Sequence, residues 1–165
     1  RTLTLLTKRS SLPPKHQTTS PDFLMRSLGI DLGAKRIGVA MSDSSGVIAS
    51  PLTVLTRSAN HKIDHKKIQE LIDENEVACV VVGLPLSMSG KPGPAAVSAQ
   101  LEIEEMRTAL SVPVHSFDER LTTKTANESM MQANMKAQAR RRIVDKIAAA
   151  VMLQGWLDHV DRKAQ

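Results

Sequence analysis

The stretch GIDLGAKRIGVAMSD, residues 29–43, joins two apolar runs through a glycine and two cations. The first run, Ser27–Leu32, reads as a buried strand, and the second, Arg36–Ser42, alternates large apolar with smaller residues as a strand does. Because the link between them is short, the stretch predicts an antiparallel hairpin. Asp31 lies inside the first apolar run, where a charged residue is seldom structural unless it is paired.

Outward from this hairpin, composition and hydrophobic periodicity predict the remaining elements. A third strand is predicted within 47–55, and Pro51 inside it favours an edge position. The other predicted elements are a helix over 61–75, a strand over 77–82, a helix over 95–110, a strand over 112–117, a short helix that begins near a capping box at 125–128, and a last helix from 140 to about 158.

This succession predicts an α/β fold with a mixed five-stranded sheet. Three strands with short links form an antiparallel meander, and two right-handed crossovers add two parallel strands. The predicted strand order is 3-2-1-4-5, with helices on both faces. The strand of Asp31 would then be central.

Composition narrows the functional classes. The 165 residues suffice for one domain, no apolar run approaches the length of a membrane span, and the single cysteine, Cys79, excludes an internal disulfide framework. The net charge of +5 is misleading, because residues 1–21 carry four cations and no acid, which leaves 18 basic against 17 acidic side chains in the rest. Binding to a polyanion must therefore depend on a local patch.

The N-terminal segment is set apart from the fold. Residues 1–25 are expected to be a disordered extension, and residues 26–160 the folded domain. The extension is rich in Ser and Thr, basic at its start, and poor in acids, which is typical of an organelle transit peptide but also of a plain leader. We therefore expect a soluble protein of cytoplasmic type, or one of the chloroplast or mitochondrion if the extension is a transit peptide.

Four acids stand where the local apolar pattern does not explain them: Asp31, Asp118, Glu119 and Asp145. Sites in open α/β sheets form at the carboxyl ends of neighbouring parallel strands, where Asp31 and the Asp118–Glu119 pair are expected to meet. Asp145 could reach the same place from a helix packed across the sheet. Clustered carboxylates without His or Cys suit Mg²⁺ or Mn²⁺.

Each acid also has an ordinary interpretation. Asp118 could be a turn residue, with Glu119 paired to Arg120. Asp145 could pair with Arg141 one turn earlier in its helix.

Four motifs together resemble the YqgF family: GIDLGAKRIGVAMSD, VVVGLP followed by SGKPGP, DERLTT, and VDKIAAAVMLQGWLD. The resemblance covers about residues 26–158. It implies an RNase H-like fold and a nuclease of the kind described both as a Holliday-junction resolvase and as the enzyme that matures the 5′ end of pre-16S rRNA. It also implies a metal-dependent catalytic site at Asp31, Asp118, Glu119 and Asp145. The chain departs from the family pattern in Ala34, where Thr is more usual, and in its N-terminal extension.

Cations near these acids are candidates for nucleic-acid binding. They are Lys35 and Arg36 in the hairpin turn, Arg120 in DER, and the group Lys136, Arg140, Arg141, Arg142 and Lys146 around Asp145. A solvated helix face is the alternative for the last group. Aromatic content of only 2% argues against a base-stacking platform and favours recognition of backbone and shape.

Two further features have competing interpretations. His61 and His65 are four residues apart and could bind a metal, but the lysines around them favour a solvated basic face. The Gly/Pro/Ser-rich loop over 83–94 either serves the site or is a plain connector.

The favoured hypothesis is a Mg²⁺- or Mn²⁺-dependent nuclease that acts on structured nucleic acid as a monomer or homodimer, with the 5′ end of an rRNA precursor as the favoured substrate. The alternatives are a resolvase of branched DNA, a non-catalytic RNA-binding factor of ribosome assembly, and a fragment of an actin-like ATPase.

Overall fold

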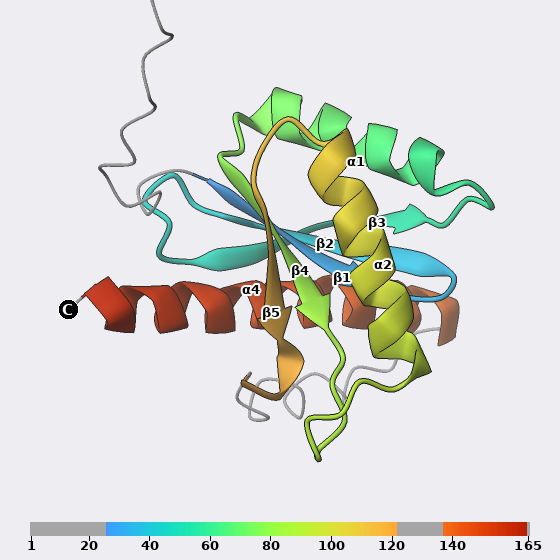
Figure 1. The fold of residues 1–165 in the computed structure, drawn as a ribbon. Helices are drawn as coiled ribbons and strands as arrows, with labels where there is room; N and C mark the ends of the chain where they lie inside the picture. Colours follow the sequence, from blue (N-terminus) through green and yellow to red (C-terminus); the bar gives the residue numbers. More distant parts are fainter. Residues whose placement is uncertain (1–25, 122–136, 165) are drawn as a thin grey trace, which may run out of the picture.

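The computed structural model of the chain describes residues 26–121 and 137–164, and in the last helix it describes side chains from 144 to 161. Five strands form one sheet in the order β3-β2-β1-β4-β5, which confirms the predicted order (Figure 1). The strands are β1 (Ser27–Leu32), β2 (Arg36–Ser42), β3 (Ala49–Thr56), β4 (Cys79–Leu84) and β5 (Val114–Asp118). The helices are α1 (His61–Asn75), α2 (Pro94–Ala109), the short 3₁₀ helix η2 (Glu119–Leu121) and α4 (Ala137–Ala164).

Strand pairing puts Asp31 in the middle of the sheet. β1 runs antiparallel to β2, with Asp31 opposite Gly38, and parallel to β4. β5 runs parallel to β4, so the ends of β1, β4 and β5 lie at the same edge of the sheet. β3 is the outer strand beside β2, and Pro51 lies in it, as predicted for an edge strand.

Helices cover both faces of the sheet. α1 and α2 pack on one face, and α4 runs across the other, beneath the strands in Figure 1. Val80 and Val82 of β4 point to the core under α1 and α2, whereas Val81 of the same strand contributes to the core under α4. Residues of one strand thus feed different cores because successive side chains point to opposite faces.

α4 approaches the sheet closely where β2 carries a glycine. A Cβ atom on Gly38 would lie 2.2 Å from the backbone oxygen of Asp145, and one on Gly29 would lie 2.7 Å from Cβ of Leu153. No side chain fits at such distances, so the two glycines allow the helix to lie directly on the strands. This close contact is what carries Asp145 to the sheet.

The boundaries of several elements differ from the predictions. β4 begins at Cys79 rather than 77, because Val77 still donates a backbone hydrogen bond to Ile72 at the end of α1. β5 begins at Val114, after Pro113, and includes Asp118 as its last residue. α4 is longer at both ends than predicted. The short helix predicted near 125–128 lies outside the described residues.

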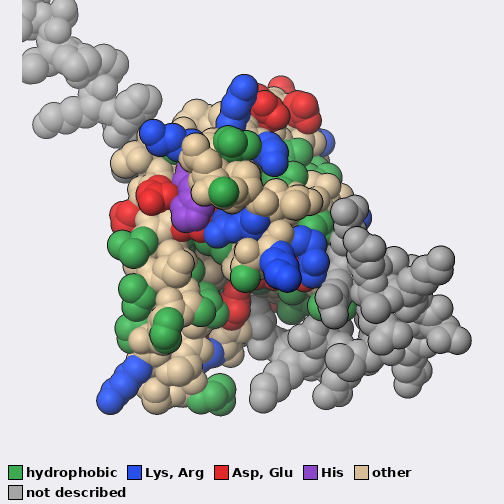
Figure 2. All heavy atoms as spheres, turned by 90° about the vertical axis from the view of Figure 1, so that its right-hand side faces the viewer, with side chains coloured by type: hydrophobic (Ala, Val, Ile, Leu, Met, Phe, Trp, Pro, Cys, Tyr) green, Lys and Arg blue, Asp and Glu red, His purple; other side chains and the backbone are tan. Residues whose placement is uncertain are grey.

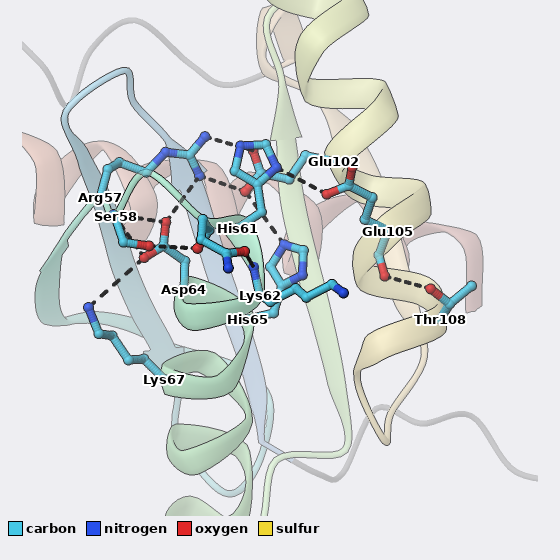
Figure 3. Close-up of polar contacts among 11 residues, drawn as sticks. Arg57, Ser58, His61, Lys62, Asp64, His65, Lys67, Glu102, Glu105 and Thr108 are labelled. Carbon is cyan, nitrogen blue, oxygen red and sulfur yellow. Dashed lines mark hydrogen bonds and ion pairs between the residues drawn. The ribbon is translucent and has the colours of Figure 1, made fainter.

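A buried ion network ties the start of α1 to α2 (Figure 3). Arg57 donates to both carboxylate oxygens of Glu102, at 2.6 and 2.7 Å, and its side chain is only 16% exposed. Asp64, fully buried, accepts hydrogen bonds from the backbone N–H of Ser58. The solvated basic face predicted for His61 and His65 is therefore wrong in part, because His65 is buried against Glu102.

Among the described residues, no helix is both long enough and apolar enough to cross a membrane.

Candidate active site

Asp31 stands next to last in β1, half-buried at the edge of the sheet where β4 and β5 also end. Burial raises the pKa of its carboxyl, and the nearby charge of Asp145 raises it further. Both causes disfavour the ionised form, so this carboxylate lies in an environment that would favour a nearby positive charge.

Glu119 reaches toward Asp31 across β4. Its pKa is raised by burial and by the charges of Asp31 and Asp118. A Cβ atom on Gly83 of β4 would lie 2.3 Å from Oε1 of Glu119. The bare backbone of Gly83 therefore makes room for this carboxylate between β5 and β1.

Asp118, although it precedes Glu119 directly, faces another partner. Both of its oxygens accept hydrogen bonds from Nε of Arg120 at 3.0 Å, and Oδ2 also accepts one from Nη2 at 2.5 Å. The Arg120 guanidinium lowers the pKa of Asp118. The pairing of Arg120 with Glu119 that was considered from the sequence is thus wrong: Asp118 is its partner.

Asp145 comes to the site from α4, which covers the face of the sheet opposite to α1 and α2. Its Oδ2 accepts a hydrogen bond from Nε of Arg36 on β2, and both side chains are 26% exposed. Asp145 also raises the pKa of Asp31, so the two carboxylates lie near each other. The observed ion pair is with Arg36 of the sheet, whereas the side chain of Arg141, the alternative partner, lies outside the described side chains.

The four predicted acids therefore divide into two groups. Asp31, Glu119 and Asp145 come from β1, η2 and α4 and are linked through the charge of Asp31. Asp118 lies beside them in a local ion pair with Arg120. Their donors are carboxylate oxygens alone, the set that suits a hard divalent cation. In the described part of the chain, however, no three His, Cys, Asp or Glu side chains stand close enough to hold an ion as they are.

Of the residues predicted to contact nucleic acid, some are exposed and others are already paired with acids. Lys35 is exposed in the hairpin turn, whereas Arg36 and Arg120 are engaged with Asp145 and Asp118. Figure 2 shows Lys and Arg side chains gathered beside acidic ones on the side of the molecule that carries the hairpin turn. Lys146 is half-buried in α4. Lys136 lies outside the described residues, and Arg140, Arg141 and Arg142 lie in α4 with side chains outside the description.

Two roles escaped the sequence interpretation. Arg36 was expected to contact phosphate, and its ion pair with Asp145 joins positions far apart in the chain. Gly83 begins the predicted loop, although a glycine directly after an apolar run is also a signal of close approach by another group. The loop after it is also tied to the site, because Nη1 of Arg120 donates to the backbone oxygen of Ser87 at 3.4 Å.

Comparison with known proteins agrees with these observations. The model of the RuvX family, described as Holliday junction resolvase, matches residues 25–159. A protein of Thermoanaerobacter pseudethanolicus with the curated name "Putative pre-16S rRNA nuclease" is 41% identical over 140 residues, which are 84% of this chain and 100% of the relative. A protein of Myxococcus xanthus with the same name is 40% identical over 134 residues, 81% of this chain and 88% of the relative.

Solved structures resemble the fold. RuvC of Thermus thermophilus in complex with a Holliday junction substrate superposes with a TM-score of 0.53 at 14% identity, covering 82% of this chain and 96% of RuvC. A second structure of Thermus thermophilus RuvC superposes with a TM-score of 0.50 at 15% identity. At such identity the likeness concerns the fold, and with the sheet order it confirms the RNase H-like architecture. By the family match and the identity to full-length relatives, the chain belongs to the RuvX family of nucleases, the family that its four motifs resemble under the name YqgF.

Proposed function

We propose that this protein hydrolyses phosphodiester bonds with a divalent cation held by Asp31, Glu119 and Asp145, and that its substrate is the 5′ end of an rRNA precursor. The observation that carries the proposal is the meeting of Asp31 with two acids from other elements, each of which comes from a distant part of the chain. Mutually repelling, partly buried carboxylates destabilise a fold unless positive charge balances them. Mg²⁺ or Mn²⁺ suits an all-oxygen donor set.

The roles of the residues follow from their positions. A divalent cation bound here would supply Lewis-acid activation of the phosphodiester and of the attacking water. Asp31 is the fixed member, because its strand is central and paired on both sides. Glu119 lies on a short 3₁₀ helix, and its carboxylate lies over the backbone of Gly83 in β4.

Asp145 is engaged by Arg36, so its carboxylate must leave that guanidinium, or share it, before it can take part in holding a cation. A released Arg36 is then available to a phosphate oxygen, to which guanidinium binds with two hydrogen bonds. Substrate binding and completion of the site would thereby be coupled through a single ion pair. Asp118 holds the guanidinium of Arg120 in position beside the site and does not itself bind the cation in this proposal.

Basic side chains supply the affinity for the nucleic-acid backbone in this proposal. Lys35 is exposed beside the site, and Lys146 follows Asp145 in α4. Together with Arg120, Lys136, Arg140, Arg141 and Arg142 they would neutralise phosphates on either side of the cleaved bond. Such binding weakens steeply with salt, because it releases condensed counterions.

The substrate assignment favours RNA because the curated relatives, which match over most or all of their length, are named for pre-16S rRNA. The second candidate is a branched DNA junction, which the family description supports. The two differ in geometry. A four-way junction presents two equivalent strands and requires two active sites, whereas trimming one RNA end requires a single copy of the protein.

A direct comparison of substrates tests this proposal. The purified protein is incubated with Mg²⁺ or Mn²⁺ and either an RNA that carries the pre-16S 5′ leader or a four-way DNA junction, and Asp145→Asn is run beside it. We expect cleavage of the leader RNA by the wild type and little by Asp145→Asn. Preferential cleavage of the junction by a dimer would favour the resolvase, and tight metal-independent RNA binding without cleavage would favour a non-catalytic assembly factor.

A further inference from the structure

An apolar pocket of about 340 Å³ opens between α2 and the loop that follows β4. Seven residues line it: Leu84, Leu86, Pro92, Ala96, Val97, Gln100 and Leu101. Val97 and Leu101 are 48% and 64% exposed, which is unusual for large apolar side chains on one helix. Figure 2 shows hydrophobic side chains gathered over α2 and this loop, at the lower left of that view.

The pocket adjoins the acidic edge of the sheet. Its wall begins at Leu84, the last residue of β4, directly after the glycine over which Glu119 lies. The loop is held to the DER segment by the hydrogen bond from Arg120 to Ser87, and a Cβ atom on Gly90 would lie 3.3 Å from Nη1 of the same guanidinium. Leu84 faces the α2 side of the sheet and Glu119 lies over Gly83 on the other side, so the pocket and the proposed catalytic acids flank the same end of β4.

The lining indicates the chemistry of the occupant. Six of the seven lining residues are apolar, and the seventh, Gln100, has its amide fixed by a hydrogen bond from Nε2 to Glu104 at 3.0 Å. Apolar walls with one fixed amide suit a flat ring system that has a polar edge. A volume of about 340 Å³ has room for one such group. Lys91, exposed in the same loop, offers charge to an adjacent phosphate.

We propose that this pocket receives one unpaired nucleobase of the substrate, next to the phosphate that is cleaved. The inference rests on the proposed nuclease function and adds a specificity site to it. Proteins read RNA sequence mainly through unstacked bases in loops and ends, because the grooves of the A-form helix conceal the base edges. With few aromatic residues in the chain, aliphatic walls would take the part that stacking platforms play elsewhere.

The test uses an RNA hairpin with a single-stranded 5′ overhang, in which 2-aminopurine or an abasic nucleotide replaces each overhang base in turn. Affinity and fluorescence are measured in EDTA, so that no cleavage occurs, and cleavage is measured separately with Mn²⁺. Val97→Trp fills the pocket from its exposed rim. Ile63→Trp on α1, where the original side chain is 49% exposed, is the matched control.

We expect one overhang position at which the abasic nucleotide lowers affinity roughly tenfold and at which 2-aminopurine changes its fluorescence on binding. Val97→Trp should remove both effects at that position, and Ile63→Trp should preserve them. Equal affinities at every position, or the same behaviour in Val97→Trp and the wild type, would overturn the inference. The inference would also be overturned if the protein formed a concentration-dependent dimer that Val97→Trp disrupts without changing RNA affinity. The pocket would then serve self-association.

The two proposals can fail separately. If the wild type cleaves the RNA but shows no position-dependent base effect, the base pocket is wrong and the nuclease function stands. If the base effect is present but no divalent cation supports cleavage, the nuclease function is wrong and the pocket stands as an RNA-binding site.

Discussion

Asp118 and Glu119 are neighbours in the chain but lie in opposite electrostatic environments. The pKa of Asp118 is lowered by Arg120, whereas that of Glu119 is raised by burial and by Asp31. The sequence predicted a metal ligand at both positions. It could not show which of the two acids faces the site, because that depends on where β5 ends. The strand runs through Asp118, and the 3₁₀ turn that follows directs Glu119 over Gly83.

Glu119→Gln should therefore affect cleavage far more than Asp118→Asn. We expect a loss of roughly a hundredfold or more in the single-turnover rate for Glu119→Gln, the size of effect seen when a group that stabilises charge in the transition state is removed. Asp118→Asn should cost less than about tenfold, since its carboxylate positions Arg120. The measurement is the single-turnover cleavage rate of both variants at saturating Mn²⁺. A greater loss of rate in Asp118→Asn would show that Asp118, and not Glu119, belongs to the catalytic group.

Gly83→Ala tests the same geometry without removing a charge. The new methyl group would overlap Oε1 of Glu119, which a flexible side chain can relieve by moving. We expect a large fall in cleavage rate with a shift of only a few degrees in Tm. Thermal unfolding and cleavage measured on the same preparation separate the two effects. Retention of the wild-type rate would show that Glu119 does not need to cross β4.

At the scale of elements, features that depend on local interactions were predicted correctly, and features that depend on contacts between distant elements were missed. β1, β2 and α1 have the predicted bounds, because their periodicity and their turn and capping signals are local. The burial of His65 was missed because it depends on Glu102, which a different helix supplies. The Asp145–Arg36 ion pair was missed for the same reason, since it joins α4 to β2, which are far apart in the chain.

The buried pair of Arg57 with Glu102 should make a large contribution to the packing of α2 on the sheet. Glu102→Ala would leave the buried guanidinium of Arg57 with only the more distant carboxylate of Asp64, 4.0 Å away. Removal of one partner of a buried ion pair typically costs about 3–5 kcal/mol. Glu105→Ala, on the exposed side of the same helix, removes only a partner of His61 and should cost less than about 1 kcal/mol. Urea unfolding of the two variants gives the comparison, and equal losses would contradict a stabilising role for the buried pair.

At the scale of the whole molecule, the site should make stability depend on pH in a definite direction. The pKa values of Asp31 and Glu119 are raised in the folded state, so the folded protein binds more protons than the unfolded chain between the ordinary and the raised pKa. Their ionisation therefore destabilises the fold as pH rises through that window, and protonation restores the lost stability as pH falls. Other carboxyls, including Asp118, act in the opposite direction.

The contribution of Asp31 can be isolated by difference. In metal-free buffer, Tm of Asp31→Asn minus Tm of the wild type should be positive near neutral pH and should shrink as the solution is acidified. Mg²⁺ or Mn²⁺ should raise Tm of the wild type at neutral pH and should do so much less in the variant, because ligands that bind only the native state stabilise it. A difference that grows on acidification would contradict the raised pKa of Asp31.

The most direct test of the account is the single-turnover cleavage of a pre-16S 5′-leader RNA by wild type and Asp31→Asn, each with Mn²⁺ and with EDTA. We predict cleavage by the wild type only when the metal is present, and a rate at least roughly a hundredfold lower for Asp31→Asn, with RNA affinity in EDTA little changed. Equal cleavage by the two proteins, or undiminished cleavage in EDTA, would contradict the assignment of Asp31 to a metal-dependent nuclease site.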